Sequence, residues 1–271
     1  MPPPEGRPNV VESLGAVALA GVRYLGGMSL LMGQTVRWTA LGMFSPKYRF
    51  GTQALARQVL RIGLRSVAVV ALVQGFIGVI LALQMTPPLK PWGQVDKVAN
   101  IIGVAGFRML GPIITAVVLS GFAGASIAAE LGSMVVSEEV EALQAIALNP
   151  VRFLVVPRVW ATLVVTILLS VLADMMIAVG GYAASIVIDA APWQYWQHMR
   201  EQLVYRDFFT GLVQSGVFGL LVSLIACYEG LSVRGGAEGV GRATTMTVVY
   251  SIVAIIAAAC VFTVVFYVFN L

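Results

Sequence analysis

The chain has 271 residues, of which 59% are hydrophobic and only 11% are charged. A water-soluble domain of this length would lack the polar surface that it needs, so the composition excludes that class and predicts a polytopic membrane protein. The formal net charge of +4 is explained better by membrane topology than by nucleic-acid binding.

The N-terminal part, residues 1–65, is predicted to stay on the cytoplasmic side and to carry amphipathic helices at the membrane surface. The segment from Leu14 to Met32 is apolar, but Arg23 interrupts it and several glycines weaken its helix. We therefore expect an interfacial helix. A sixth span is the open alternative.

A basic stripe precedes the first span. Arg57, Arg61 and Arg65 recur every four residues, so they share one helix face. Such a stripe can lie against anionic lipid headgroups where the chain enters the membrane. The alternative is a solvated helix face with no role toward lipid.

Residues 66–271 are predicted to form a transmembrane domain of five helices. A span takes about 20 apolar residues, and the candidates are Ser66–Met85, Phe107–Ala129, Val159–Ile188, Phe208–Tyr228 and Met246–Phe269. Lys and Arg are retained preferentially on the cytoplasmic side. With the N-terminus inside and the C-terminus outside, twelve of the 17 basic residues lie in the cytoplasm, which favours this orientation.

Small residues dominate the second span. Gly121, Ala125 and Ala129 fall every four residues, and Gly124 and Ala128 form a parallel row. Small side chains let helix backbones approach closely in lipid. We expect a helix interface here, either within the chain or between two copies.

A short acidic helix, at about residues 137–149, is predicted between the second and third spans. Ser137 resembles a hydroxyl cap, early carboxylates complement the helix dipole, and Asn149-Pro150 ends the helix. Helical spacing places four apolar residues on one side: Val140, Leu143, Ile146 and Leu148. This helix is too short and too charged to span lipid. It should lie beside the membrane and offer a face to a partner, or else be an ordinary surface helix.

Polar groups inside spans are costly and usually have a reason. Asp174 lies midway through the third span, where it is either a proton-linked site or a buried carboxyl hydrogen-bonded to a neighbouring helix. Glu130 and Glu229 end the second and fourth spans. They are expected to pair with Arg158, Arg234 or Arg242.

Several familiar chemistries are missing from the sequence. No GxxxxGK[ST] phosphate loop is present, so any use of ATP must come from a partner. One histidine, His198, and two cysteines predicted within spans, Cys227 and Cys260, give neither a metal cluster nor a disulfide framework. The glycines from Gly230 to Gly241 predict a flexible turn.

The central motifs resemble a known family. The runs AAELGSMVVSEEVEAL and NPVRFLVVPRVWA, followed by GRATT from Gly241 and TVVY from Thr247, closely resemble the MlaE/YrbE permeases of MCE-linked ABC transporters. The resemblance extends from about Leu14 to the end of the chain. It implies an all-α membrane protein with an interfacial N-terminal helix and five transmembrane helices, in the bacterial inner membrane, with a periplasmic C-terminus.

The same resemblance implies partners. Separate ABC ATPase chains would bind ATP, an MCE-domain substrate-binding protein would join outside, and a second permease copy, identical or paralogous, would complete the transporter. The chain itself would hold no cofactor and would not be an enzyme. The acidic helix would couple it to the ATPase through Glu138, Glu139, Val140, Leu143 and Ile146.

The chain also departs from the family pattern. Relatives carry Arg-Glu-Leu-Gly-Pro and Gly-Arg-Ala-Gly at the second span, where this chain has Arg108-Met109-Leu110-Gly111-Pro112 and Gly121-Phe122-Ala123-Gly124. The family's Asp-Pro after the coupling helix is Asn149-Pro150. A charge-based gate of relatives is therefore not carried over to this chain.

The outer end of the first span is the candidate lipid pocket. It is apolar, Pro87-Pro88 is expected to break the helix so that backbone lines a cavity, and the resemblance points to the same region. The residues are Leu81, Gln84, Met85, Leu89 and Trp92. An aromatic belt residue is the alternative for Trp92.

The sequence thus predicts an ABC permease subunit that moves phospholipid or another hydrophobic lipid between the inner membrane and an MCE protein. One alternative is an ion- or proton-coupled secondary transporter or channel that uses Asp174 and needs no ATPase. Another is a membrane scaffold that transports nothing.

Overall fold

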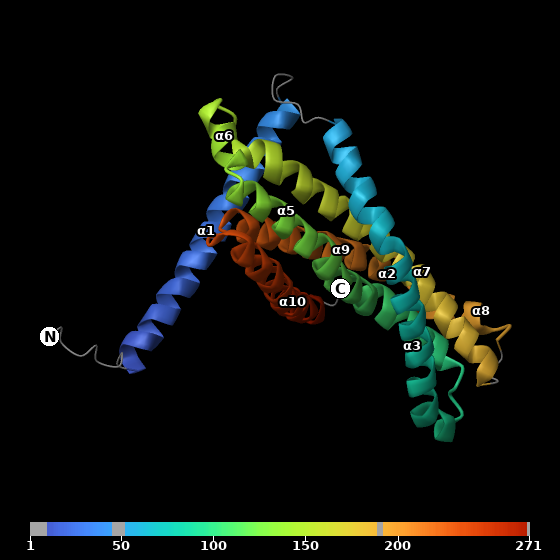
Figure 1. Ribbon diagram of the computed structural model, residues 1–271. Coiled ribbons are helices and arrows are strands. Elements are labelled where there is room, and N and C mark those ends of the chain that lie inside the picture. Colours follow the sequence, from blue (N-terminus) through green and yellow to red (C-terminus); the bar gives the residue numbers. More distant parts are fainter. Residues whose placement is uncertain (1–9, 45–51, 189–191, 270–271) are drawn as a thin grey trace.

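The computed structural model describes residues 10–44, 52–188 and 192–269, which are helical almost throughout (Figure 1). The long helices are α1 (Val10–Phe44), α2 (Thr52–Leu89), α7 (Val156–Val187), α9 (Tyr205–Leu231) and α10 (Gly236–Val268). The shorter ones are η2 (Lys90–Trp92), α3 (Lys97–Ala105), η3 (Gly106–Leu110), α4 (Gly111–Leu119), η4 (Ser120–Gly124), α5 (Ala125–Val136), α6 (Glu139–Ala145), η5 (Val151–Val155) and α8 (Tyr195–Gln202). No strand occurs in these ranges, which confirms the all-α fold class.

Five helical segments are long and apolar enough to cross a membrane, as predicted. They are Leu55–Trp92, Lys97–Val136, Val151–Val187, Tyr205–Leu231 and Gly236–Val268. Each segment is longer than the span predicted from the sequence, because the helix continues beyond the apolar run at its centre. In particular, α2 is continuous across residue 65, so the basic stripe and the first span share one helix.

The second span is not a regular α-helix. The segments η3 and η4 are π-helical, and they separate α3, α4 and α5. A π-helical segment changes the backbone hydrogen-bonding pattern locally and often marks a functional position. Both segments begin or end with glycine, and Pro112 follows the first of them.

The core of the bundle is built around α7, which packs against α2 on one side and α9 on the other (Figure 1). Its buried residues include small and hydroxyl side chains beside large apolar ones, and the helix carries two adjacent glycines, Gly180 and Gly181. A Cβ on Gly180 would collide with the backbone of Gly75 on α2, so the small residue permits this close helix crossing.

Helix α1 extends away from the bundle, with its first half projecting beyond the other helices (Figure 1). Apolar side chains such as Leu19, Val22 and Leu25 are largely exposed there. Its second half is held: Trp160 Nε1 donates to Thr39 Oγ1 at 3.1 Å, and Arg152 lies over the Trp38 ring. Helix α1 is not among the five segments long and apolar enough to span, and its interfacial position stays a prediction.

The two rows of small residues in the second span have different surroundings. Gly124 lies against Thr247 of α10 and Val222 of α9, and Ala128 packs on Gly230. This row is an interface within the chain. Gly121 is exposed with open space beside it, so the other row is not fully covered by the chain itself.

Two local predictions need correction. Pro87 and Pro88 do not interrupt α2 but lie in its last turn, and the helix ends one residue later at Leu89. Each proline lacks the N–H that would bond the carbonyl four residues before it, which is consistent with the helix ending there. The glycine-rich segment is mostly helix: α10 starts at Gly236, and only residues 232–235 form the turn. Gly235 and Gly236 adopt φ of 90° and 70°, which reverses the chain within that short turn.

Candidate functional site

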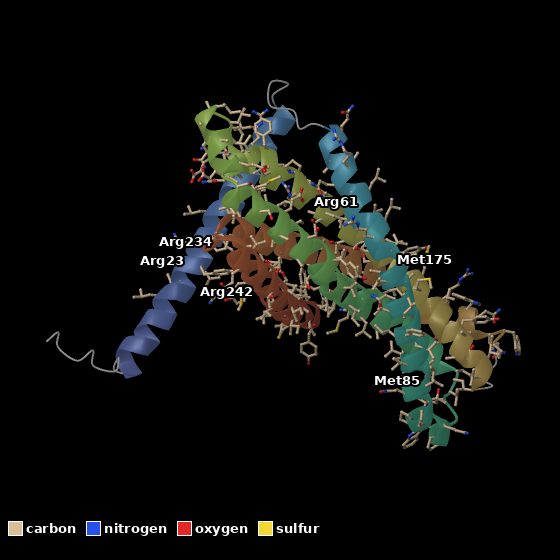
Figure 2. All side chains as sticks on the ribbon, viewed as in Figure 1. Arg23, Arg61, Met85, Met175, Arg234 and Arg242 are labelled. Carbon is tan, nitrogen blue, oxygen red and sulfur yellow. The ribbon has the colours of Figure 1, made fainter. Side chains whose placement is uncertain are left out.

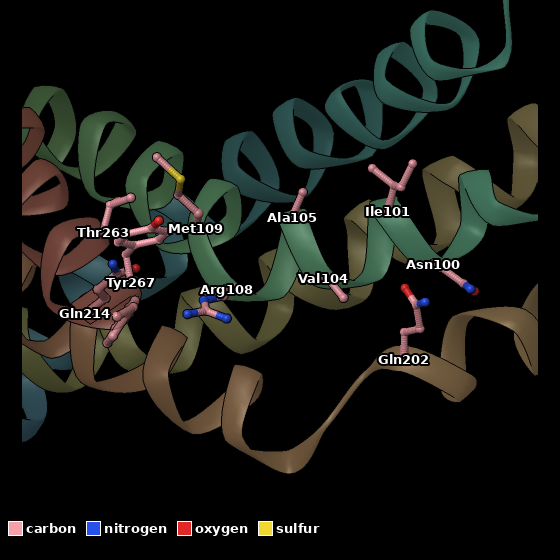
Figure 3. Close-up of a pocket in the computed structure, with 11 residues that line it drawn as sticks. Asn100, Ile101, Val104, Ala105, Arg108, Met109, Gln202, Gln214, Thr263 and Tyr267 are labelled. Carbon is pink, nitrogen blue, oxygen red and sulfur yellow. The ribbon is translucent and has the colours of Figure 1, made fainter. Parts of the chain in front are cut away.

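An apolar hollow with one charged group lies between α3, η3 and the end of α10, and we call it the α3–α10 groove (Figure 3). Its volume is about 490 Å³. The second, fourth and fifth spans contribute to it, together with Gln202 just before α9. The lining residues are Asn100, Ile101, Val104, Ala105, Arg108, Met109, Gln202, Gln214, Thr263, Phe266 and Tyr267.

Arg108 is the charged residue of this groove. Its Nη1 donates to Asp207 Oδ1 at 3.3 Å, and its guanidinium lies 5.1 Å from the centre of the Phe266 ring. The pair with Asp207 and the aromatic ring hold the cation in place at the groove wall. An apolar wall with one fixed cation suits an amphipathic ligand that has apolar tails and an anionic head.

The residues predicted as a lipid pocket lie on the neighbouring helix and not in this groove. Leu81, Met85 and Leu89 on α2 are half-buried against a cluster that includes Val98 and Ile102 of α3. Gln84 is exposed, and Trp92 is 78% exposed. The α3–α10 groove was missed because it joins three spans that are distant in the sequence.

The acidic helix is present as α6, but it is shorter than predicted. Glu138 and Ala147 both adopt φ of 59°, so a tight turn bounds the helix on each side. The Ser137 hydroxyl does not cap it, because it donates to the Ser133 carbonyl oxygen of the preceding helix. Asn149 accepts from the backbone N–H of Val151 at 3.0 Å and so caps the next helical segment.

The predicted coupling residues in and beside α6 differ in their exposure to solvent. Glu138 and Glu139 are exposed, Val140 and Leu143 are half-buried, and Ile146 is 66% exposed. Beside this helix lies a hollow of about 570 Å³, formed by α1, α6 and the segment before α7 and lined by Gln34, Val140, Gln144, Ala147, Leu148, Asn149, Pro150, Val151 and Leu231. An apolar residue as exposed as Ile146 is available to a partner.

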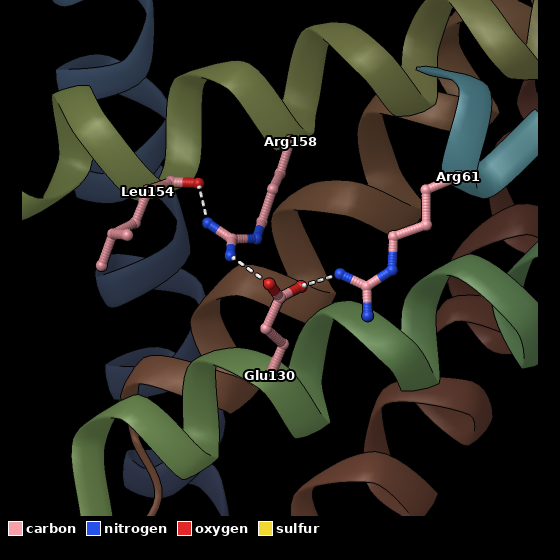
Figure 4. Close-up of polar contacts among 4 residues, drawn as sticks. All are labelled: Arg61, Glu130, Leu154 and Arg158. Carbon is pink, nitrogen blue, oxygen red and sulfur yellow. Dashed lines mark hydrogen bonds and ion pairs between the residues drawn. The ribbon is translucent and has the colours of Figure 1, made fainter. Parts of the chain in front are cut away.

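A charged network joins three spans near α6 (Figure 4). Glu130 on α5 bonds Arg158 Nη2 at 3.2 Å and Arg61 Nη1 at 3.3 Å, and Arg158 Nη1 donates to the Leu154 carbonyl oxygen at 2.7 Å. The predicted pairing of Glu130 with Arg158 is confirmed. Arg61 was missed as a partner, because nothing in the sequence indicates a pairing across two helices.

Glu229 does not form the predicted ion pair within the described part of the chain. It lines a hollow of about 310 Å³ with Tyr24, Arg234 and Arg242, and Figure 2 shows these two arginines where α1 passes the start of α10. Burial, and then the negative charge of Glu229, raise the pKa of the Tyr24 hydroxyl. The phenol is therefore neutral at physiological pH.

We expect the Glu130 network to stabilise the fold. Replacing Glu130 with Ala leaves Arg158, whose side chain is only 5% exposed, without its counter-charge. Removing one partner of a buried pair costs about 3 to 5 kcal/mol, so thermal unfolding of the detergent-solubilised protein should begin at a markedly lower temperature. The Arg61 side chain is 46% exposed, and Arg61→Gln should cost less than about 1 kcal/mol. Equal effects of the two substitutions would contradict this assignment.

The chain was compared with known proteins. The family model described as Permease MlaE matches residues 55–265. A probable ABC transporter permease protein of Rickettsia felis is 37% identical over 203 residues, which cover 74% of this chain and 78% of that protein. The intermembrane phospholipid transport system permease protein MlaE of Haemophilus influenzae is 28% identical over 250 residues, covering 90% and 92%. The chloroplastic protein TRIGALACTOSYLDIACYLGLYCEROL 1 of Arabidopsis thaliana is 32% identical over 216 residues, covering 74% and 58%.

Proposed function

The chain belongs to the MlaE permease family, and we propose on that basis that it moves phospholipid, or a similar lipid, between the bacterial inner membrane and an MCE protein. The single observation that carries the substrate class is the α3–α10 groove. Its wall is apolar, and its one cation is held at the edge by Asp207. We place the lipid tails along Val104 and Ala105 and the phosphate near Arg108.

ATP hydrolysis is proposed to occur on a separate ATPase chain that docks on α6. Support comes from the exposed Ile146 beside exposed glutamates. Figure 1 shows α6 at the end of the bundle opposite α3, which lines the α3–α10 groove. The relatives named as ABC transporter permeases give the same expectation. Neither observation favours a secondary transporter driven through Asp174.

A second copy of the permease is proposed to cover the exposed face of α10 and η4. Val253 and Ile256 on α10 and Phe122 in η4 are large apolar residues with exposed side chains, and Gly121 beside them leaves room for close helix approach.

For the membrane orientation, we propose that the N-terminus lies in the cytoplasm and the C-terminus in the periplasm.

Photocrosslinking tests the lipid site. A photoreactive residue would be placed at Ala105 in the α3–α10 groove, at Gln84 in the region predicted from the sequence, and at Met175, which is 60% exposed on α7 outside both. Each variant would be reconstituted with radiolabelled phosphatidylglycerol. We expect the strongest labelling at Ala105.

The labelling at these three positions distinguishes a lipid site in the α3–α10 groove from a site on α2 and from unspecific labelling by the bilayer. Stronger labelling at Gln84 than at Ala105 would indicate that lipid binds at the end of α2, as predicted from the sequence. Equal labelling at all three would mean that the probe reports bulk bilayer, and the assignment of lipid to the α3–α10 groove would be withdrawn.

A further inference from the structure

Three polar side chains from different helices meet at Gly111, at the start of α4. Gln74 on α2 donates through Nε2 to the Gly111 carbonyl oxygen and to Thr115 Oγ1, both at 3.1 Å. A Cβ on Gly111 would overlap Asp174 Oδ1 of α7, so the carboxyl lies directly against this glycine. All three side chains are buried. We call Gln74, Thr115 and Asp174 the Gly111 cluster.

Three buried oxygens of this cluster receive no hydrogen bond from the described residues. Both carboxyl oxygens of Asp174 and the Oε1 of Gln74 are buried without a hydrogen-bond partner. The amide of Gln74 has two N–H groups, and its two hydrogen bonds account for both. The Thr115 hydroxyl makes no hydrogen bond to any of these three oxygens either, so an ionised Asp174 would leave three buried acceptors without a donor. Among the described residues, Asp174 accepts no hydrogen bond from a neighbouring helix, so the predicted bond is not formed with the carboxyl as acceptor.

The charged groups of the surrounding elements do not supply the missing partner. Helix α2 carries three arginines before Gln74, and α4 carries no charged residue. In η3 and α9, Arg108 bonds Asp207. Among the side chains that the structure describes, the remaining charged ones on the elements that pack on α7 are Arg23, Arg37, Lys97, Arg152, Arg206 and Glu229. Neither carboxyl oxygen of Asp174 accepts a hydrogen bond from any of these groups.

Ionisation of Asp174 would be costly here. The side chain is 1% exposed, within a span, and a buried, unpaired carboxylate costs several kcal/mol. A neutral carboxylic acid avoids that cost and brings its own O–H donor. We propose that the Gly111 cluster is a proton-binding site, in which Asp174 holds a proton and its hydroxyl donates within the cluster.

The bound proton has a structural consequence for the irregular second span. Helix α4 carries Gly111 and Thr115 and lies between the π-helical segments η3 and η4. A neutral cluster joins this span to α2 and α7 without placing a charge in the bilayer. Loss of the proton would put a carboxylate at that junction and separate the three helices.

Infrared spectroscopy of the purified permease complex in lipid nanodiscs tests the proposal. At neutral pH, the spectrum of the wild type minus that of Asp174→Asn should contain the carbonyl stretch of a protonated carboxyl. Asp207→Asn is the matched control: its carboxylate bonds Arg108, so that difference spectrum should contain carboxylate bands and no carbonyl stretch of a protonated carboxyl. A carboxylate signature in the Asp174 difference spectrum would overturn the proposal.

Two further measurements test proton binding by the Gly111 cluster, and the first of them does not require the Asp174→Asn variant. Gln74→Leu removes one acceptor of the Gly111 cluster, so it should shift the protonated-carboxyl band of the wild type; an unchanged band would place that proton elsewhere. A bound sodium ion is the competing occupant. If sodium chloride, relative to choline chloride, stabilised the wild type against thermal unfolding but not Asp174→Asn, a cation site would replace the proton site.

Discussion

Ile146→Asp should release the ATPase from the solubilised complex and abolish lipid transport while the permease still inserts and folds. Ile146 is the most exposed apolar residue of the α6 region, so the change should disturb the permease itself very little. Burying the new carboxylate in an apolar docking surface should cost about 3 kcal/mol, or roughly a hundredfold in affinity. The measurement is co-purification of the ATPase with tagged permease, together with ATP-dependent lipid transfer.

Ile146→Val is the matched control for this prediction, since it keeps an apolar side chain at the same position and should retain the ATPase. Ile146 gives a sharper test than Leu143, which is half-buried against the permease and could act through the fold. If the Asp variant retains the ATPase as well as the Val variant does, α6 does not dock through this residue.

Ala105→Trp should fill the α3–α10 groove and reduce lipid transfer by at least about tenfold at normal expression. Ala105 lines the groove, so an indole there would occupy the space assigned to lipid tails. The strain of added bulk at a partly open site should stay below the roughly 1 to 3 kcal/mol of core overpacking. Transfer would be measured in proteoliposomes with a fluorescent phospholipid.

Ala183→Trp provides the comparison for this substitution. Ala183 is exposed on α7 outside the groove, so the same side chain should leave transfer close to that of the wild type. Similar losses in both variants would indicate a general effect of added bulk in the membrane. Normal transfer in Ala105→Trp would exclude the groove as the lipid path.

The sequence by itself determined the class of the protein, the number of spans and the family. These rest on properties that are local in the chain: the length of apolar runs, the acidic helix between two of them, and the motif around Glu130 and Asn149-Pro150. Local properties survive folding in lipid because each span must satisfy its own backbone hydrogen bonds. The five candidate spans all appear as helices for this reason.

Only the tertiary structure decided which side chains meet. The α3–α10 groove joins Ala105 to Phe266, and Glu130 pairs with Arg61 of a distant helix. Gln74 and Asp174 both lie against Gly111. In water an apolar stripe marks the face that a helix buries, but in lipid the exposed face is equally apolar. Contacts between spans are therefore set by shape, small residues and a few polar groups, which sequence spacing does not assign to partners.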